Sequence, residues 1–200
     1  MRTFLSADFF DRPATKVARE LLGKYLVRSF PGRGGRRGRA VALMITEVEA
    51  YDGPRDRASH ASRGRTPRNA PMFGKAGRFY VYFTYGMHWL ANVVTGPEGY
   101  PAAVLLRAGV SRDPATGEER PLRGPALLAR FLGIGKAHCG KPAGRRTGLW
   151  FEDRGAKIPP RAIIARRRTG VDYAGPYWAG RKYNFSAAPE RISKSRVKPR

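Results

Sequence analysis

Apolar residues recur along the chain with two different spacings, and each spacing predicts a different kind of element. Near the N-terminus, the apolar residues of segment 17–22 lie three and four positions apart, which places them on one face of a helix. Pro13 suits the first turn of that helix, and Gly23 suits its end. A second helix is expected after Pro125, where the apolar residues of segment 127–132 repeat at the same spacing.

Other apolar runs, bounded by turn residues, predict strands. These are Tyr25–Phe30, Ala40–Ala50, Phe79–Phe83, Trp89–Val94, Ala102–Ala108, Leu149–Glu152 and Ala162–Ala165. The charged segment Ser111–Arg123 is expected to be a loop. Because strands dominate without alternating regularly with helices, the predicted fold class is α+β, with a curved, mostly antiparallel sheet flanked by helices. We expect a single domain of residues 1–185 and a basic C-terminal tail of residues 186–200 that frays at its end.

The charge balance is the strongest compositional signal. The chain has 39 Lys and Arg residues against 15 Asp and Glu residues, a formal net charge of +24. Self-repulsion on that scale disfavours a compact state, so a polyanionic partner is expected. No stretch of the chain, the basic loops 32–39 and 136–146 included, pairs its basic residues with an apolar helical face, so nucleic acid is preferred to a membrane as the partner. Charge alone does not distinguish an enzyme from a passive binder.

The sequence shows no sign of a membrane span, a signal peptide or a metal site. No apolar run approaches the ~20 residues that a span needs, and residues 1–10 are too short and too mixed for a signal peptide. The single cysteine, Cys139, cannot form an internal disulfide and has no other metal ligands at a suitable spacing. We therefore expect a soluble intracellular monomer without metal or cofactor, cytoplasmic or nucleoid-associated in a bacterium and nuclear in a eukaryote.

Two carboxylates beside a tyrosine mark the end of the longest predicted strand. Residues two apart in a strand face the same way, so Glu47, Glu49 and Tyr51 share one side. Such a group could supply a general base, and it could equally be a solvated strand end. Arg107 ends the apolar strand that begins at Ala102, which is an expensive place for an unpaired cation. Glu47 or Glu49 would pair with it, in a catalytic site or in a purely structural ion pair.

Aromatic residues crowd the segment 79–89, and most of them are expected in the core of the sheet. Tyr85 is the exception, because Tyr85-Gly86-Met87 joins two predicted strands and an aromatic at a hairpin tip is exposed. Exposed aromatics on a basic surface commonly stack on bases or wedge between them. His60, between small residues in a basic loop, is either the wall of a pocket or a surface histidine.

The order of these motifs resembles that of the alkyladenine (3-methyladenine) DNA glycosylase family. The matching residues are Glu49-Ala50-Tyr51, Gly53-Pro54, Asp56, His60, Thr66-Pro67-Arg68-Asn69, Met72-Phe73, Gly77, Tyr80-Val81-Tyr82, Tyr85-Gly86-Met87, Asn92, Val104-Leu105-Leu106-Arg107-Ala108, Gly124-Pro125-Ala126-Leu127-Leu128, Trp150, Gly170-Val171 and Ala174-Gly175. Each short motif is weak by itself, but their ordered sum is specific and extends from about Phe4 to Phe185.

The resemblance implies a single α+β domain whose β-hairpin enters the minor groove of DNA. Glu49 would be the general base, and Arg107 would help to hold the attacking water. Tyr85, with Met87 beside it, would fill the gap left by a flipped nucleotide. The pocket for the base would be formed by Tyr51, His60, Tyr82, Asn92 and Val171. The phosphate contacts would come from Arg65 and Arg68.

The activity implied by the resemblance is that of a monofunctional hydrolase of base excision repair that acts on N-glycosyl bonds. Its substrates would be alkylated or deaminated purines in duplex DNA, namely 3-methyladenine, 7-methylguanine, hypoxanthine and ethenoadenine. Water activated by Glu49 would attack the sugar of the flipped nucleotide, and no cofactor would be needed.

Three other interpretations are open at the level of the sequence. A DNA-binding protein without catalysis would share the charge and Tyr85 but would not need Glu49. A glycosylase with lyase activity would use a lysine amine as its nucleophile, and Lys75 is the nearest candidate. A helix-hairpin-helix glycosylase would use the segment 132–135 (Leu-Gly-Ile-Gly), with Asp153 as its catalytic acid.

Overall fold

The computed structural model describes residues 2–32, 38–189 and 193–194 of the 200-residue chain. Its strands are β1 (Thr3–Phe4), β2 (Tyr25–Phe30), β3 (Arg39–Asp52), β4 (Phe79–Thr84), β5 (His88–Thr95), β6 (Ala102–Arg112), β7 (Glu119–Arg123), β8 (Leu149–Asp153), β9 (Ala156–Lys157), β10 (Ile164–Arg166), β11 (Asn184–Ser186) and β12 (Ser193–Lys194). Its α-helices are α1 (Ala7–Phe10), α2 (Ala14–Leu21), α3 (Pro125–Phe131) and α4 (Gly175–Gly180). Short 3₁₀ helices are η1 (Ala70–Phe73), η2 (Lys136–His138), η3 (Arg145–Thr147), η4 (Pro160–Ala162) and η5 (Asp172–Ala174).

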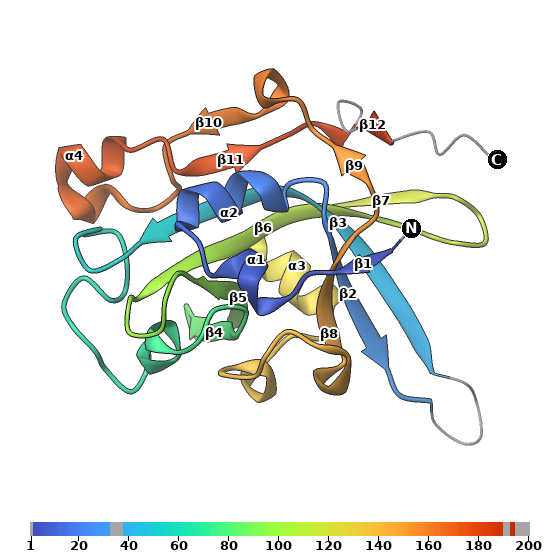
Figure 1. The fold of residues 1–200 in the computed structure, drawn as a ribbon, viewed down its shortest axis with the longest axis horizontal. Helices are drawn as coiled ribbons and strands as arrows, with labels where there is room; N and C mark the ends of the chain where they lie inside the picture. The colour runs from blue at the N-terminus through green and yellow to red at the C-terminus, as the bar shows by residue number, and fades with distance from the viewer. Residues whose placement is uncertain (1, 33–37, 190–192, 195–200) are drawn as a thin grey trace.

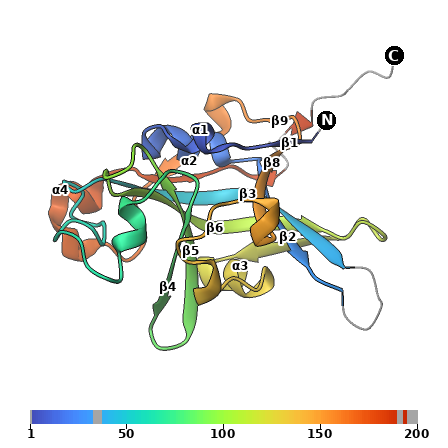
Figure 2. The same cartoon turned by 60° about the horizontal axis from the view of Figure 1, so that its bottom comes forward.

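One large sheet organises the chain (Figure 1). Its main path has the strand order β1-β8-β2-β3-β6-β5-β4, and β7 pairs with β6, β11 with β3, and β10 with β11. All of these pairings are antiparallel. Helices α1 and α2 lie on one face of the sheet and α3 on the other (Figure 2). The predicted α+β class with a mostly antiparallel sheet is therefore confirmed.

The two longer helices form where the apolar spacing predicts them, because each buries one face against the sheet. Helix α2 buries Val17, Ala18 and Leu21 completely. Helix α3 begins at Pro125, whose fixed φ suits the first helical position, and buries Leu128. The strands β2, β3, β4, β5, β6 and β8 also form where their apolar runs predict them.

The prediction of a loop over Ser111–Arg123 is wrong at both ends and holds only for residues 113–118. Strand β6 continues to Arg112, and β7 returns beside it with Ser111 opposite Arg120 and Arg112 opposite Glu119. Only Leu122 of the five residues of β7 is buried, so the sequence of this segment has no apolar run that would predict a strand. It forms because it supplies backbone partners to the otherwise unpaired edge of β6.

Four smaller expectations concern one strand, one basic loop, the C-terminal tail and the domain boundary. The strand expected over Ala162–Ala165 begins at Ile164, because Pro160–Ala162 forms η4. The basic loop 32–39 and the tail 186–200 fall largely on residues 33–37, 190–192 and 195–200, which lie outside the described part of the chain. Within the tail, β12 pairs with β9. The domain boundary expected after residue 185 stays a prediction.

Candidate active site

A row of paired residues across five strands forms the floor of the site. From β11 through β3, β6 and β5 to β4, the row consists of Asn184, Glu49, Leu105, Asn92 and Tyr80. Directly paired residues of antiparallel strands point to the same face of the sheet. The register therefore places a carboxylate, two amides and a phenol on one face, although they come from distant parts of the sequence.

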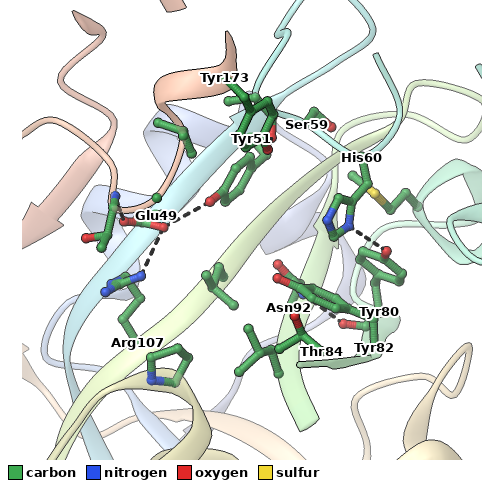
Figure 3. A pocket seen from close by; sticks show the side chains of 18 of the residues that line it. Glu49, Tyr51, Ser59, His60, Tyr80, Tyr82, Thr84, Asn92, Arg107 and Tyr173 are labelled. Carbon is green, nitrogen blue, oxygen red and sulfur yellow. Dashed lines mark hydrogen bonds and ion pairs between the residues drawn. The ribbon is translucent and has the colours of Figure 1, made fainter. Parts of the chain in front are cut away.

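A cavity of about 310 Å³ lies over this row (Figure 3). It is bounded by the end of β3, the loop that follows it, the β4–β5 hairpin and the segment that leads into η5. The residues lining it include all those predicted from the sequence for catalysis or for the base pocket: Glu49, Tyr51, His60, Tyr82, Asn92, Arg107 and Val171. The fold therefore brings these side chains together, and their individual roles remain predictions.

Glu49 is completely buried, so it is not a solvated strand end. Its Oε1 accepts hydrogen bonds from the backbone N–H of Thr169 at 2.8 Å and from the Asn184 amide at 3.1 Å. Its Oε2 accepts a bond from the Tyr51 hydroxyl at 3.0 Å and lies 3.3 Å from Nη1 of Arg107. Each of these partners is a donor, so the surroundings suit an ionised carboxylate, which only accepts hydrogen bonds.

Tyr51 is held as a donor to this carboxylate. Burial, together with the negative charge of Glu49, raises the pKa of Tyr51 well above its ordinary value. The phenol therefore keeps its proton at neutral pH and donates a hydrogen bond to Glu49 (Figure 3).

An irregularity between β3 and β6 brings Arg107 to the carboxylates. The register shifts on both sides of Glu47, and Arg107 is left without a direct partner on β3. Its Nε lies 2.8 Å from Oε1 of Glu47, while Nη1 reaches Glu49, so it pairs with both candidate partners. Burial lowers the pKa of Arg107, but the two carboxylates outweigh this effect and raise it overall. Arg107 is therefore a fixed cation at the cavity wall.

His60 forms part of the aromatic wall of the cavity. Its Nδ1 lies 2.8 Å from the Tyr80 hydroxyl, and its ring meets that of Tyr82 edge-on with 4.6 Å between ring centres. Burial, and then the charge of Arg68, lower the pKa of His60 below its ordinary value. Burial raises the pKa of Tyr82 to about 12. Both rings are therefore uncharged at neutral pH.

The two polar atoms of the Asn92 amide differ, because the nitrogen is bonded within the fold and the oxygen, among the described residues, is not. Its Nδ2 donates a hydrogen bond to the backbone oxygen of Tyr80 at 3.0 Å (Figure 3). Its Oδ1 makes no hydrogen bond with any residue that the structure describes, and Asn92 lines the cavity. The bond to Tyr80 thus fixes the amide and leaves an acceptor for a ligand.

The tip of the β4–β5 hairpin is exposed and strained. Tyr85 is 85% exposed and Met87 67% exposed. Tyr85 has a φ of +52° and Gly86 a φ of +66°, as in the type I′ turns that suit the twist of a hairpin. A tyrosine in the left-handed region carries a conformational cost that packing at this exposed tip does not offset. Such strain at an exposed position suggests a role in binding.

The two arginines expected to contact phosphates lie outside the cavity lining. Arg68 lies with its guanidinium carbon 5.3 Å from the Tyr82 ring centre, and its Nη2 is 3.4 Å from the Phe83 carbonyl oxygen. Arg65 lies 5.7 Å from the ring centre of Phe73. Both arginines are exposed, so the backbone of a bound DNA could reach them. Their contacts with phosphates stay predictions.

The residues of the rival interpretations lie away from the cavity. Lys75 is exposed and does not line it. Asp153 bonds to Lys24 at the end of β8. Across the described residues, no group of three or more His, Cys, Asp or Glu side chains could hold a metal ion. None of the described helices is long and apolar enough to cross a membrane.

Thr169, Asn184 and Tyr173 are among the residues of the site that were not predicted from the sequence. Thr169 contributes only a backbone N–H, which no side-chain pattern reveals. Asn184 lies in a three-residue strand, where a polar residue beside Phe185 gives little signal. Tyr173 lines the cavity and donates its hydroxyl to the Ala58 carbonyl at 3.0 Å.

Comparison with known proteins accounts for most of the chain. Residues 8–190 match the family model of methylpurine-DNA glycosylase (MPG). The chain is 46% identical over 184 residues to a protein of Methanocella arvoryzae, with 86% of each chain covered. It is 47% identical over 182 residues to a protein of an Anaeromyxobacter species (91% of this chain, 88% of the relative) and 42% identical over 203 residues to one of Burkholderia orbicola (94% and 93%). All three relatives are provisionally named 3-methyladenine DNA glycosylases. The chain therefore belongs to the methylpurine-DNA glycosylase family.

Proposed function

We propose that the protein is a monofunctional DNA glycosylase of base excision repair that hydrolyses the N-glycosidic bond of alkylated and deaminated purines. One observation carries the proposal: a fully buried carboxylate, Glu49, faces an aromatic cavity large enough to admit a small ligand and is held there by donors. A DNA-binding protein without catalysis would have no use for this arrangement, because burying a carboxylate is costly. The family and the names of the relatives support the same activity.

The first step is extrusion of the damaged nucleotide. A base within the duplex cannot reach the cavity, so it is flipped out at a cost of a few kcal/mol. Tyr85, at the exposed tip beside the cavity mouth, enters the space that the base leaves and replaces part of the lost stacking. The charge of +24 supplies the general attraction for the DNA backbone.

Recognition of the base depends on the aromatic faces and the charge of the side chains that line the cavity. Alkylated purines are electron-poor and some are cationic, so they stack well on the faces of Tyr51 and Tyr82. His60 is neutral at neutral pH because its pKa is lowered, and it therefore does not repel a cationic base. Asn92 offers its free oxygen to the purine edge.

Bond cleavage uses water and the buried carboxylate. The water oxygen bonds to the anomeric carbon, and its proton passes to Glu49. The glycosidic electron pair leaves with the purine nitrogen. The sugar is oxocarbenium-like at the transition state, so the negative charge of Glu49 stabilises it, as in inverting glycoside hydrolysis. Arg107 orients the carboxylate and offers a further N–H to the water.

The proposal is tested with duplex oligonucleotides that carry hypoxanthine, ethenoadenine or 3-methyladenine at one position. Incubation followed by alkali should produce strand breaks at the lesion and leave an undamaged duplex intact. Excision should survive EDTA, and borohydride should trap no covalent adduct, because the nucleophile is water rather than a lysine amine. A trapped adduct would favour a lyase, and uncleaved lesions would favour a passive binder.

A further inference from the structure

Arg168 and Asp56 form an ion pair whose side chains have no exposed surface. Both carboxylate oxygens bond to guanidinium nitrogens, with 2.8 Å between Nη2 and Oδ1. Taking two charges out of water is expensive, and well-packed apolar residues of similar volume are often at least as stable as a buried ion pair. Arg168 also buries its Nε without any partner among the described residues. Stability alone therefore gives no reason for this pair.

The arginine links β3 and α4 close to the carboxylate of Glu49. Its Nη1 donates to the carbonyl oxygen of Ala50 on β3 at 2.9 Å, and its Nη2 donates to that of Trp178 on α4 at 3.3 Å. The next residue along the chain, Thr169, presents its N–H to Oε1 of Glu49. With Arg168 fixed on β3, this N–H can hardly move away from the carboxylate.

The aspartate shapes the loop that follows β3 and leads to His60. Its Oδ2 accepts a hydrogen bond from the backbone N–H of Asp52, and its Oδ1 accepts one from that of Ala58, each at 3.1 Å. These bonds close the turn after β3 and set the path of the chain toward His60. The same carboxylate thus braces a second wall of the cavity.

The guanidinium also supports an aromatic wall. Its carbon lies 4.8 Å from the centre of the Tyr51 ring and 5.3 Å from that of Tyr183. Tyr51 lines the cavity and Arg168 does not, so the cation backs the ring from the side away from the ligand. Cation–π contact at this distance favours one position of the ring.

We propose that Arg168 and Asp56 are positioning residues for excision, which hold the Thr169 N–H on Glu49 and the Tyr51 ring at the cavity wall. The inference rests on the proposed function, since it assigns the pair to the same site. Neither side chain touches the substrate. Misplacing catalytic groups by about an ångström can cost roughly 100-fold in rate, so a well-fixed scaffold has measurable value here.

The test replaces the pair by apolar residues in the double variant Asp56→Leu/Arg168→Met. The matched control, Lys24→Met/Asp153→Leu, removes a partly buried ion pair that does not line the cavity. Excision of hypoxanthine is followed in single turnovers with enzyme in excess, so that the rate at saturation and the half-saturating concentration are separated. We expect the saturated rate of the first variant to fall about 10- to 100-fold. Its half-saturating concentration and its melting temperature should change little, and the control should keep the wild-type rate.

Two further measurements make the test decisive. Arg168→Lys keeps a cation beside Asp56 but loses the paired N–H donors of the guanidinium. Its excision rate should therefore lie between those of the wild type and Arg168→Met. Fluorescence of ethenoadenine in bound duplex should differ between wild type and the double variant, because the Tyr51 wall is displaced. A folded double variant with the wild-type rate would overturn the inference. If the double variant does not fold, a wild-type rate in Arg168→Lys would overturn it. Absence of excision by the wild type would instead contradict the proposed function.

Discussion

The two ends of the cavity are built in opposite ways. At the corner where β3, β6 and β11 meet, Glu49 is completely buried and contacts four donors. At the hairpin tip, Tyr85 is 85% exposed in a left-handed conformation, and its side chain has no hydrogen-bond partner among the described residues. The proposed roles account for this contrast, because a base would have to be in place before the substrate arrives, whereas an inserting side chain would stay free until DNA supplies its partner. The fold thus holds the side chain at the corner, whereas at the tip we expect bound DNA to hold it.

The comparison predicts its largest effect at the corner, in Glu49→Gln. The amide cannot take a proton from water, so the rate of excision should fall by about 10²- to 10⁴-fold. Binding of lesion-containing duplex should remain nearly intact, because the cavity and the hairpin are unchanged. Single-turnover excision and a gel-shift titration measure the two quantities separately.

Glu47→Gln is the matched control for this substitution. Glu47 lies two residues away on the same face and shares Arg107 and Asn184, but it does not line the cavity. The excision rate of Glu47→Gln should fall far less than that of Glu49→Gln. An equal loss in both variants would show that the pair acts through charge alone and that Glu49 is not the base.

At the opposite end, Tyr85→Ser should impair flipping more than bond cleavage. Stacking of an aromatic on a base contributes about 1–3 kcal/mol, so the equilibrium for flipping should weaken by roughly 5- to 150-fold. Ethenoadenine fluorescence in the duplex reports the flipped fraction directly. Tyr177→Ser is the control, because Tyr177 is 65% exposed but does not line the cavity. Unchanged flipping in Tyr85→Ser would contradict the wedge.

The two regions also differ in how far the sequence reveals them. Tyr85 is predictable because a glycine turn between two apolar strands places it at an exposed tip, and it is found there. Glu49 and Arg107 are predictable as charges at the ends of apolar runs, and they are found together, although β3 continues to Asp52 and β6 to Arg112. The residues on either side in the sequence are enough to predict where these three side chains lie.

Two partners of Glu49, Thr169 and Asn184, could not be predicted from local pattern. Thr169 and Asn184 follow Glu49 by 120 and 135 positions and reach it only through long-range packing. Arg168 lies in a run of three arginines that has the composition of a solvated basic stretch, yet it is buried. Strand β7 was missed similarly, because its pairing with β6 depends on an open sheet edge rather than on its own apolar residues.

Asn92 lies between these extremes, since one half of its amide is fixed and the other is free. Guanine differs from hypoxanthine by one exocyclic amino group, and a close fit at the purine edge would reject guanine by a clash. Asn92→Ser should therefore raise the ratio of guanine to hypoxanthine excision, by about tenfold if one such clash is worth 1.4 kcal/mol. Competition between the two bases in matched duplexes gives that ratio. A constant ratio with both rates reduced would show that the bond to Tyr80 is the whole role of Asn92.

The smallest effect should appear in the stability of the free protein, in Tyr85→Asn. Asparagine tolerates the left-handed region better than tyrosine, so the free energy of unfolding should rise by about 0.5–1 kcal/mol. Met87→Asn is the control, because Met87 is also exposed but does not have a positive φ, and it should bring no such gain. Urea unfolding of both variants measures the change, and ethenoadenine fluorescence should show that flipping is weakened in Tyr85→Asn. A variant that is more stable but flips less well would mean that the strain at the tip is kept for insertion into DNA. A loss of stability would mean instead that Tyr85 is held by contacts within the fold, and the contrast between corner and tip would then fail.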